Sequence, residues 1–199
     1  EYQIPSPNNM LYEMSLMIGT SSTKVSDMFR ETSAGNNDFG SLKRVYQVTP
    51  ATVSDFDADG KFNDAPAGAK AIPVEVHHSA YAWNTSPYRK FVIVKYAIKN
   101  TSTSALTNLY AGIVADWDIT DAGKNKGAYD AINKMGYCYD LNTNGIYAGI
   151  KLLSNSAPAI NNIIDLMNGG NGGIDATADF TTAEKYTALS TSRNADGFS

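Results

Sequence analysis

The segment from Phe91 to Ile119 constrains the fold more than any other part of the sequence. It holds two runs of β-branched and aromatic residues, FVIVKYAIKN at 91–100 and LYAGIVADWDI at 109–119, separated only by a short polar segment. Runs of this composition and length predict strands. Parallel strands need a crossover of about a dozen residues or more, usually a helix, and no helical pattern lies between the two runs. The segment therefore predicts two antiparallel strands.

The same pattern recurs along the chain and predicts an all-β fold. Further strand-like runs, joined by short polar connections, lie at 11–18, 44–48, 72–83, 135–139 and 146–153. Sheets with one apolar face must stack to bury it, which favours an antiparallel β-sandwich. Two short helices are expected near the C-terminus. One covers 157–167, with isoleucines at helical spacing, and the other begins at a capping box of Thr181 and Glu184 and runs to about Leu189.

Composition narrows the class of protein. The 199 residues suffice for one domain, 1–199, and a formal net charge of −4 argues against nucleic acid, which favours a basic surface. Fifteen of the 20 acidic residues are aspartate, a turn former, as expected for a β protein with polar loops outside the cell. The single cysteine, Cys138, excludes an internal disulfide, and no apolar run is long enough for a membrane span. Because the first residue is not methionine, we expect a segment of a larger secreted or cell-surface polypeptide.

The sequence DFDADGKFND at 55–64 is the strongest candidate for a metal site. Its aspartates alternate with other residues ahead of Gly60, which matches the first half of a D-x-D-x-D-G calcium loop. Alternate side chains of a curled loop can converge on one ion, and Pro66 stands where an EF-hand would have its last glutamate. The expected calcium ligands are Asp55, Asp57, Asp59, the backbone carbonyl of Lys61, and Asp64. The alternative is a solvated hairpin turn rich in aspartate.

Two further segments carry oxygen ligands at similar spacing. Their candidate metal ligands are Asp140, Asn142 and Asn144 in DLNTNG, and Asp116, Asp118 and Asp121 in DWDITD. In the first segment, Asn144 followed by glycine also predicts an ordinary hairpin turn. In the second, two carboxylates on one face of a strand suit a cation, a solvated strand end, or acid/base catalysis as in glycosidases.

Other signals of catalysis are weak. His77 and His78 are adjacent, so on a strand they point to opposite faces and cannot bind one metal ion together. The sequence has neither a G-x-S-x-G nucleophile motif nor a glycine-rich phosphate loop in a strand–helix unit. These observations favour a module that does not catalyse a reaction.

Two tryptophans are candidates for stacking against a sugar. Trp83 lies in AWNTSPY and Trp117 in ADWDI, and both stand near the end of a strand-like run, where a ring can stay exposed. Flat aromatic rings offer a large apolar face to a ligand. The two residues therefore support carbohydrate binding as an alternative function.

The order of the motifs resembles an accessory β-domain of secreted multidomain proteins, notably of Bacteroidota-type bacteria. The resemblance covers roughly residues 10–192 and is carried by MIGT, DFDADG, HSAYAW, the segment from Phe91 to Ile119, GYCYD and IYAGI. In such proteins the domain often follows a subtilisin-like protease domain. The residues of the protease triad do not fall in this segment, so the resemblance implies a supporting role and not protease activity.

The sequence thus predicts a non-catalytic, extracellular accessory module that is stabilised by calcium and supports a larger secreted or cell-surface protein. The expected partners are other domains of the same polypeptide, and a glycan or a protein surface. A carbohydrate-binding module and a hydrolase that uses paired aspartates are the alternatives.

Overall fold

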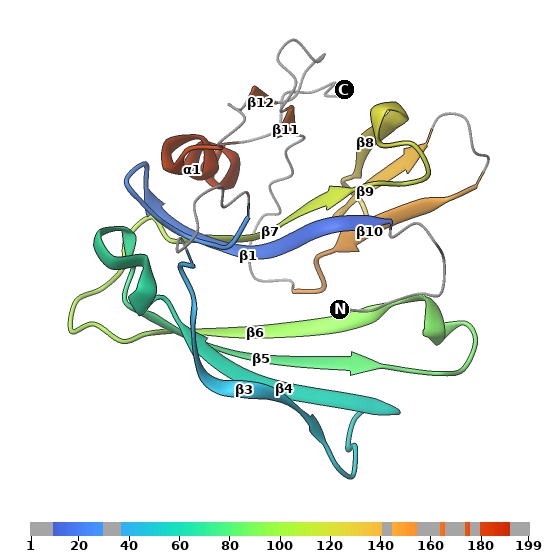
Figure 1. The fold of residues 1–199 in the computed structure, drawn as a ribbon, viewed down its shortest axis with the longest axis horizontal. Helices are drawn as coiled ribbons and strands as arrows, with labels where there is room; N and C mark the ends of the chain where they lie inside the picture. Colours follow the sequence, from blue (N-terminus) through green and yellow to red (C-terminus); the bar gives the residue numbers. More distant parts are fainter. Residues whose placement is uncertain are drawn as a thin grey trace.

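In the computed structural model the chain folds mainly into antiparallel β-sheets (Figure 1). The structure describes residues 10–29, 37–140, 145–154, 164–165, 174–175 and 180–191. The strands are β1 (Leu11–Ser21), β2 (Lys24–Ser26), β3 (Gly40–Val48), β4 (Phe56–Asn63), β5 (Val74–Ala82), β6 (Val92–Asn100), β7 (Tyr110–Trp117), β8 (Asn125–Asp130), β9 (Met135–Asp140), β10 (Tyr147–Lys151), β11 (Ile164–Asp165) and β12 (Ile174–Asp175). The helical elements are the 3-10 turns η1 (Ala65–Lys70), η2 (Tyr88–Lys90) and η3 (Ala122–Lys124), and the helix α1 (Thr182–Ser190).

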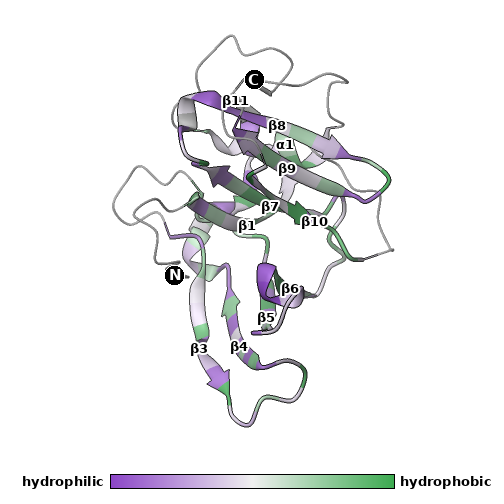
Figure 2. Cartoon of the chain, turned by 90° about the vertical axis from the view of Figure 1, so that its right-hand side faces the viewer, coloured by the Kyte–Doolittle hydropathy of each residue, from purple (hydrophilic) through white to green (hydrophobic). Residues whose placement is uncertain are grey.

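Within the described ranges, the strands form three antiparallel sheets and one short parallel pair. The largest sheet has the order β3-β4-β5-β6, and the other two have the orders β2-β1-β7 and β10-β9-β8. β11 pairs with β12 in parallel. The β3–β4 side of the four-stranded sheet extends away from the other two sheets in both views (Figure 1, Figure 2).

The predicted all-β, antiparallel fold is confirmed. Each predicted strand corresponds to an observed one, namely β1, β3, β5, β6, β7, β9 and β10, with ends that differ by a few residues. β2, β4 and β8 were not predicted. β2 is only three residues long and β8, with the sequence NKGAYD, is largely polar, so neither has a clear apolar alternation.

The core has two parts, one on each face of β1. On one face, Leu16 and Ile18 pack against Val74 and Val76 of β5, which joins the three-stranded sheet β2-β1-β7 to the four-stranded sheet as in a sandwich. On the other face, Met17 packs in a second cluster with residues that include Val25, Val114 and Phe180, against which side chains of α1 pack. The side chains of β1 point alternately to its two faces, and over its second half both faces are covered and buried.

The helix that begins after Thr181 is confirmed, and its capping box is present. The Glu184 N–H donates to the Thr181 hydroxyl, and the Glu184 carboxylate accepts from the Thr181 N–H. The helix expected at 157–167 falls mostly outside the described residues. For the two that are described, Ile164 and Asp165, the helix prediction is wrong, because they pair with Ile174 and Asp175 as strands.

None of the helices in the described ranges has the length and hydropathy that a membrane span requires.

Candidate functional site

The acidic segment 55–64 forms an inner strand and not a curled loop. Residues 56–63 are β4, which pairs with β3 on one side and β5 on the other. The expectation of a calcium loop or hairpin turn is therefore wrong in its geometry. The reason is visible in the sequence, because the apolar or small residues Phe56, Ala58, Gly60 and Phe62 alternate with polar residues at the period of a strand.

Gly60 has a different role from the turn that the calcium-loop pattern assigns to it. A Cβ atom at this position would lie 2.5 Å from Nε2 of His78 and 3.2 Å from the Cα of Val45. The glycine therefore makes room for the His78 ring on the inner face of the sheet. There His78 packs edge-on against Phe62 and stacks on Tyr96, and burial lowers the pKa of its imidazole.

Asp57 holds the turn that precedes β4. Its carboxylate is almost fully buried and accepts backbone N–H groups of Thr52, Val53 and Ser54 at 2.7–2.9 Å, together with the hydroxyls of Thr52 and Ser54. The Ser54 hydroxyl, with the three N–H groups, holds the pKa of the Asp57 carboxyl well below its usual range. Five donors from the chain thus saturate this carboxylate.

Asp59 lies two residues on and binds a different set of groups. Its Oδ2 atom bonds the Nε2 atom of His77 and accepts the Ser79 hydroxyl at 3.3 Å, and the Lys43 ammonium lies 3.9 Å from Oδ1. Partial desolvation raises the pKa of the Asp59 carboxyl, but the hydrogen bond and charge of His77 outweigh it, so the net shift is downward. His77 and His78 lie on opposite faces of β5, as predicted.

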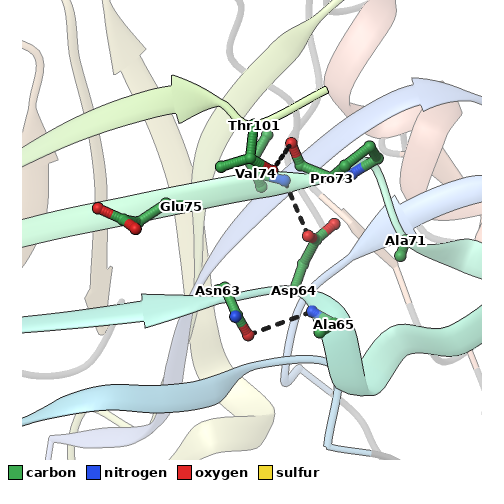
Figure 3. A pocket seen from close by; sticks show the side chains of 8 residues that line it. All are labelled: Asn63, Asp64, Ala65, Ala71, Pro73, Val74, Glu75 and Thr101. Atoms are coloured by element: carbon green, nitrogen blue, oxygen red, sulfur yellow. Dashed lines mark hydrogen bonds between the residues drawn. The ribbon is translucent and has the colours of Figure 1, made fainter. Parts of the chain in front are cut away.

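Asp64 is buried at the start of η1, and its carboxylate points toward Val74 of β5 (Figure 3). Its carboxylate accepts the backbone N–H groups of Ile72 and Val74 and the Ser26 hydroxyl. At the other end of β4, the Asp55 carboxylate accepts the N–H of Asn84 at 2.9 Å. Lys61 directs its ammonium toward Glu75, at 3.7 Å.

The expected calcium ligands of this segment are therefore directed to separate places. Each of the four aspartates accepts hydrogen bonds from a different part of the chain, and an extended strand does not curl their oxygens around one point. In this arrangement the five groups do not fit one calcium shell of six to eight oxygens.

A hollow of about 310 Å³ lies beside Asp64 (Figure 3). Its polar lining groups bind partners within the chain. The Asn63 side chain accepts the Ala65 N–H, the Thr101 hydroxyl donates to the Pro73 carbonyl, and Glu75 lies near Lys61. The hollow thus has few polar groups left to orient a ligand, which a small-molecule site needs.

A buried charge cluster lies between β2 and α1. The Lys185 ammonium is 2.7 Å from both Oδ1 of Asp27 and the carbonyl of Phe29, and Lys70 forms a second ion pair with buried Asp38 at 3.0 Å. Burial raises the pKa of the Asp27 carboxyl, and the charge of Lys185 opposes this. The sequence offers only one hint of the pair, which is that Lys185 shares a helix face with Leu189.

The predicted sites at 116–121 and 140–144 have a mixed outcome. Asp116 lies in β7, whereas Asp118 follows the end of that strand and Asp121 binds Lys124 at 2.8 Å, so the two carboxylates expected on one strand face do not both lie in the strand. Asp140 is buried at the end of β9, and Asn142 and Asn144 lie outside the described residues. Metal binding at these positions stays a prediction. Within the described ranges, no three His, Cys, Asp or Glu side chains gather as a metal site.

Trp83 belongs to an aromatic cluster at the β5–β6 turn. Its ring lies 6.5 Å from that of Tyr88 and 5.8 Å from that of Phe91, and the latter two rings are exposed. Trp117, the other predicted sugar-stacking residue, is half-buried at the end of β7, opposite Leu11. Trp83 therefore lies in a cluster of a kind that can bind a ligand.

A second aromatic cluster joins Tyr137, Tyr139 and Tyr147 on one face of β9 and β10. Their ring centroids are 5.6–6.2 Å apart. Tyr147 is directly opposite Tyr139 in the hairpin. The sequence places Tyr137 and Tyr139 on one face of a strand, because they stand two residues apart. It does not predict their register with Tyr147, since a two-residue turn at Asn144-Gly145 would place Tyr147 opposite Asn142.

Comparison of the chain with family models, with curated proteins and with solved structures gives no match.

Proposed function

We propose that the chain is a non-catalytic accessory module of a larger secreted or cell-surface protein, as its resemblance to accessory β-domains implies. The observation that carries the proposal is the use of the acidic residues. The carboxylates of Asp57, Asp59 and Asp64 form hydrogen bonds with turns and strands of the chain itself. Such carboxylates support a fold, whereas catalytic carboxylates need a free face toward a substrate.

Calcium stabilisation stays a prediction of the sequence. The hydrogen bonds that the chain donates to the carboxylates of Asp57 and Asp64 support a different prediction, in which these carboxylates stabilise the fold without an ion. The two can be separated by thermal melts of the wild-type chain and of the Asp57→Asn and Asp64→Asn variants, each with calcium and with a chelator.

If the carboxylates serve only the fold, both variants melt at lower temperature than the wild type, by the same amount with and without calcium. A chelator-sensitive melt of the wild type that either variant abolishes would contradict the ion-free prediction and establish a calcium site in this segment. Assays with peptide and glycan substrates address the hydrolase alternative. Hydrolysis by the wild type that is lost in an Asp116→Asn variant would overturn the non-catalytic role.

Carbohydrate binding is a second candidate, supported by the cluster of Trp83, Tyr88 and Phe91. Exposed aromatic rings at a turn between strands offer apolar faces to a sugar. A glycan array tests this candidate. We expect any glycan signal to be lost in Trp83→Ala and retained in the control Trp117→Ala, and an array without signal for the wild type would reject the candidate.

A further inference from the structure

Within the described residues, β6 is a long and regular free edge of the four-stranded sheet. It pairs with β5 through all nine residues without a register shift, and no strand of the described residues pairs with its other edge. The opposite edge strand, β3, pairs with β4 through two register shifts. Irregularities of that kind disturb an edge and discourage further pairing. β6 is therefore the edge of this sheet that is suited to accept another strand.

The inner face of β6 is apolar, and part of it is exposed. Val92 and Val94 are 48% and 41% exposed, although they share a face with Ile98, which packs on the core. Phe56, in the same cross-strand row as Val92, is 46% exposed. A strand added beside β6 would place every second side chain on this face and would extend the existing core over it.

The outer face of β6 is cationic. Lys95 and Lys99 alternate with Ile93 and Ala97 on this face, both lysines are exposed, and neither has an ion pair within the described part of the chain. Carboxylates on the matching face of an added strand would meet these two charges. Two copies of this chain that paired through β6 would instead bring like charges together, which disfavours a second copy as the occupant.

We infer that β6 accepts a β-strand from a partner, an extended peptide segment of about nine residues with apolar residues at every second position and acidic residues between them. Backbone hydrogen bonds along the edge would supply affinity. The apolar face and the two lysines would supply the choice of sequence. The inference rests on the accessory role proposed above and adds a partner to it. The two can fail separately, because the module can support a larger protein without accepting a strand at β6.

The test uses three synthetic nine-residue peptides and the full chain. In the first, valine alternates with glutamate; in the second, valine alternates with lysine; the third has the composition of the first in an order without alternation. We expect saturable binding of the first peptide, measured by fluorescence anisotropy, and much weaker binding of the other two. Two N-methylated forms of the first peptide extend the test, each methylated on one of the two alternating sets of amides. Only one set of N–H groups faces β6, so one form should lose binding and the other should keep it.

Charge reversal at the edge sharpens the test. The double variant Lys95→Glu/Lys99→Glu should bind the valine–glutamate peptide roughly tenfold more weakly and should gain affinity for the valine–lysine peptide. The control variant Lys134→Glu/Lys151→Glu carries the same change of charge away from β6 and should bind as the wild type does. Equal binding of ordered and scrambled peptides, indifference to both N-methylation patterns, or unchanged preference in the β6 variant would overturn the inference. None of these outcomes alters the chelation and activity tests of the proposed function.

Discussion

The two ends of the four-stranded sheet differ in burial although their sequence pattern is the same. At one end, Val76 of β5 is fully buried in the row that it shares with Phe62 and Ile98. At the other end, Phe56 and Val92 occupy the same face of the same strands and are nearly half exposed. We call the first the closed end and the second the open end.

The difference lies in the layer that covers the face. Leu16 and Ile18 of β1 cover the closed end. Met14, on the same face of β1 but nearer its start, is itself 50% exposed. Alternation therefore determines which way a side chain points, whereas a second layer determines whether it is buried. Stability should come from the closed end, and the open end is where the inferred partner strand would extend the apolar face.

The largest effect is expected from the buried charge cluster that joins α1 to β2, behind the closed end. Lys185→Met leaves the Asp27 carboxylate buried without its cation and should lower the free energy of unfolding by about 3–5 kcal/mol. Lys61→Met, which removes a partly exposed ion pair to Glu75, is the control and should cost about 0–1 kcal/mol. Urea unfolding measures both.

The pH dependence of the Lys185→Met variant has a defined sign. Burial raises the pKa of Asp27, so the folded state binds a proton more readily than the unfolded state does. Without Lys185, stability should fall as the pH rises through this raised pKa, and the deficit relative to the wild type should shrink as the pH is lowered through it. A deficit that does not change with pH would show that Asp27 is not the origin of the cost.

Two substitutions on one face of β1 test the comparison directly. Ile18→Ala, at the closed end, should cost about 2–5 kcal/mol because it leaves a cavity between the two sheets. Met14→Ala removes a half-exposed side chain and should cost less than about 1 kcal/mol. Equal costs in urea unfolding would mean that the two ends do not differ in packing.

At the open end, stability near the turn before β4 should depend on Asp57 and therefore on pH. Its pKa is lowered below the ordinary value of 3.8, so the stability that it contributes is present above that pH and is lost as the pH falls below it. Asp57→Asn should be less stable than the wild type at pH 7, and its stability should fall less steeply in acid. Parallel curves for the two proteins from pH 7 to pH 3 would contradict this role.

The smallest effect is expected at the start of α1. Thr181→Ala removes the side-chain cap and should cost about 1 kcal/mol in thermal or urea unfolding. Thr187→Ala, in the exposed part of the same helix, is the control and should change stability by no more than about 0.5 kcal/mol. Similar effects of the two changes would show that the capping box contributes little.

Local patterns predicted much of this fold. Alternation predicts β5, runs of β-branched and aromatic residues predict β6 and β7, and the capping box predicts α1, because each signal lies within a few neighbouring residues. The sequence of β4 fits two patterns, which is why the calcium-loop prediction fails there. Its aspartates match a ligand pattern and its apolar residues match a strand pattern at once, and pairing with strands on both sides decided in favour of the strand.

The candidate sites were less predictable, because most depend on long-range contacts. Asp27 and Lys185 are 158 residues apart and leave no local pattern. Trp83 was identified from its place beside a turn, but its neighbours Tyr88 and Phe91 come together only through the packing of that turn. The exposure of Val92 and Val94 depends on how far β1 covers the inner face of β6. The alternation of residues in the sequence does not predict this.

Native-state hydrogen exchange tests the contrast between the two ends most directly. Amides are followed one by one along β5 and β6, which pair in unbroken register from Val74 with Asn100 to Ala82 with Val92. The account predicts that, among the amides that are hydrogen-bonded between β5 and β6, those near Val76 and Ile98 exchange only through global unfolding. Those near Ala82 and Val92 should exchange through local opening of much lower free energy. Equal protection along both strands would contradict it.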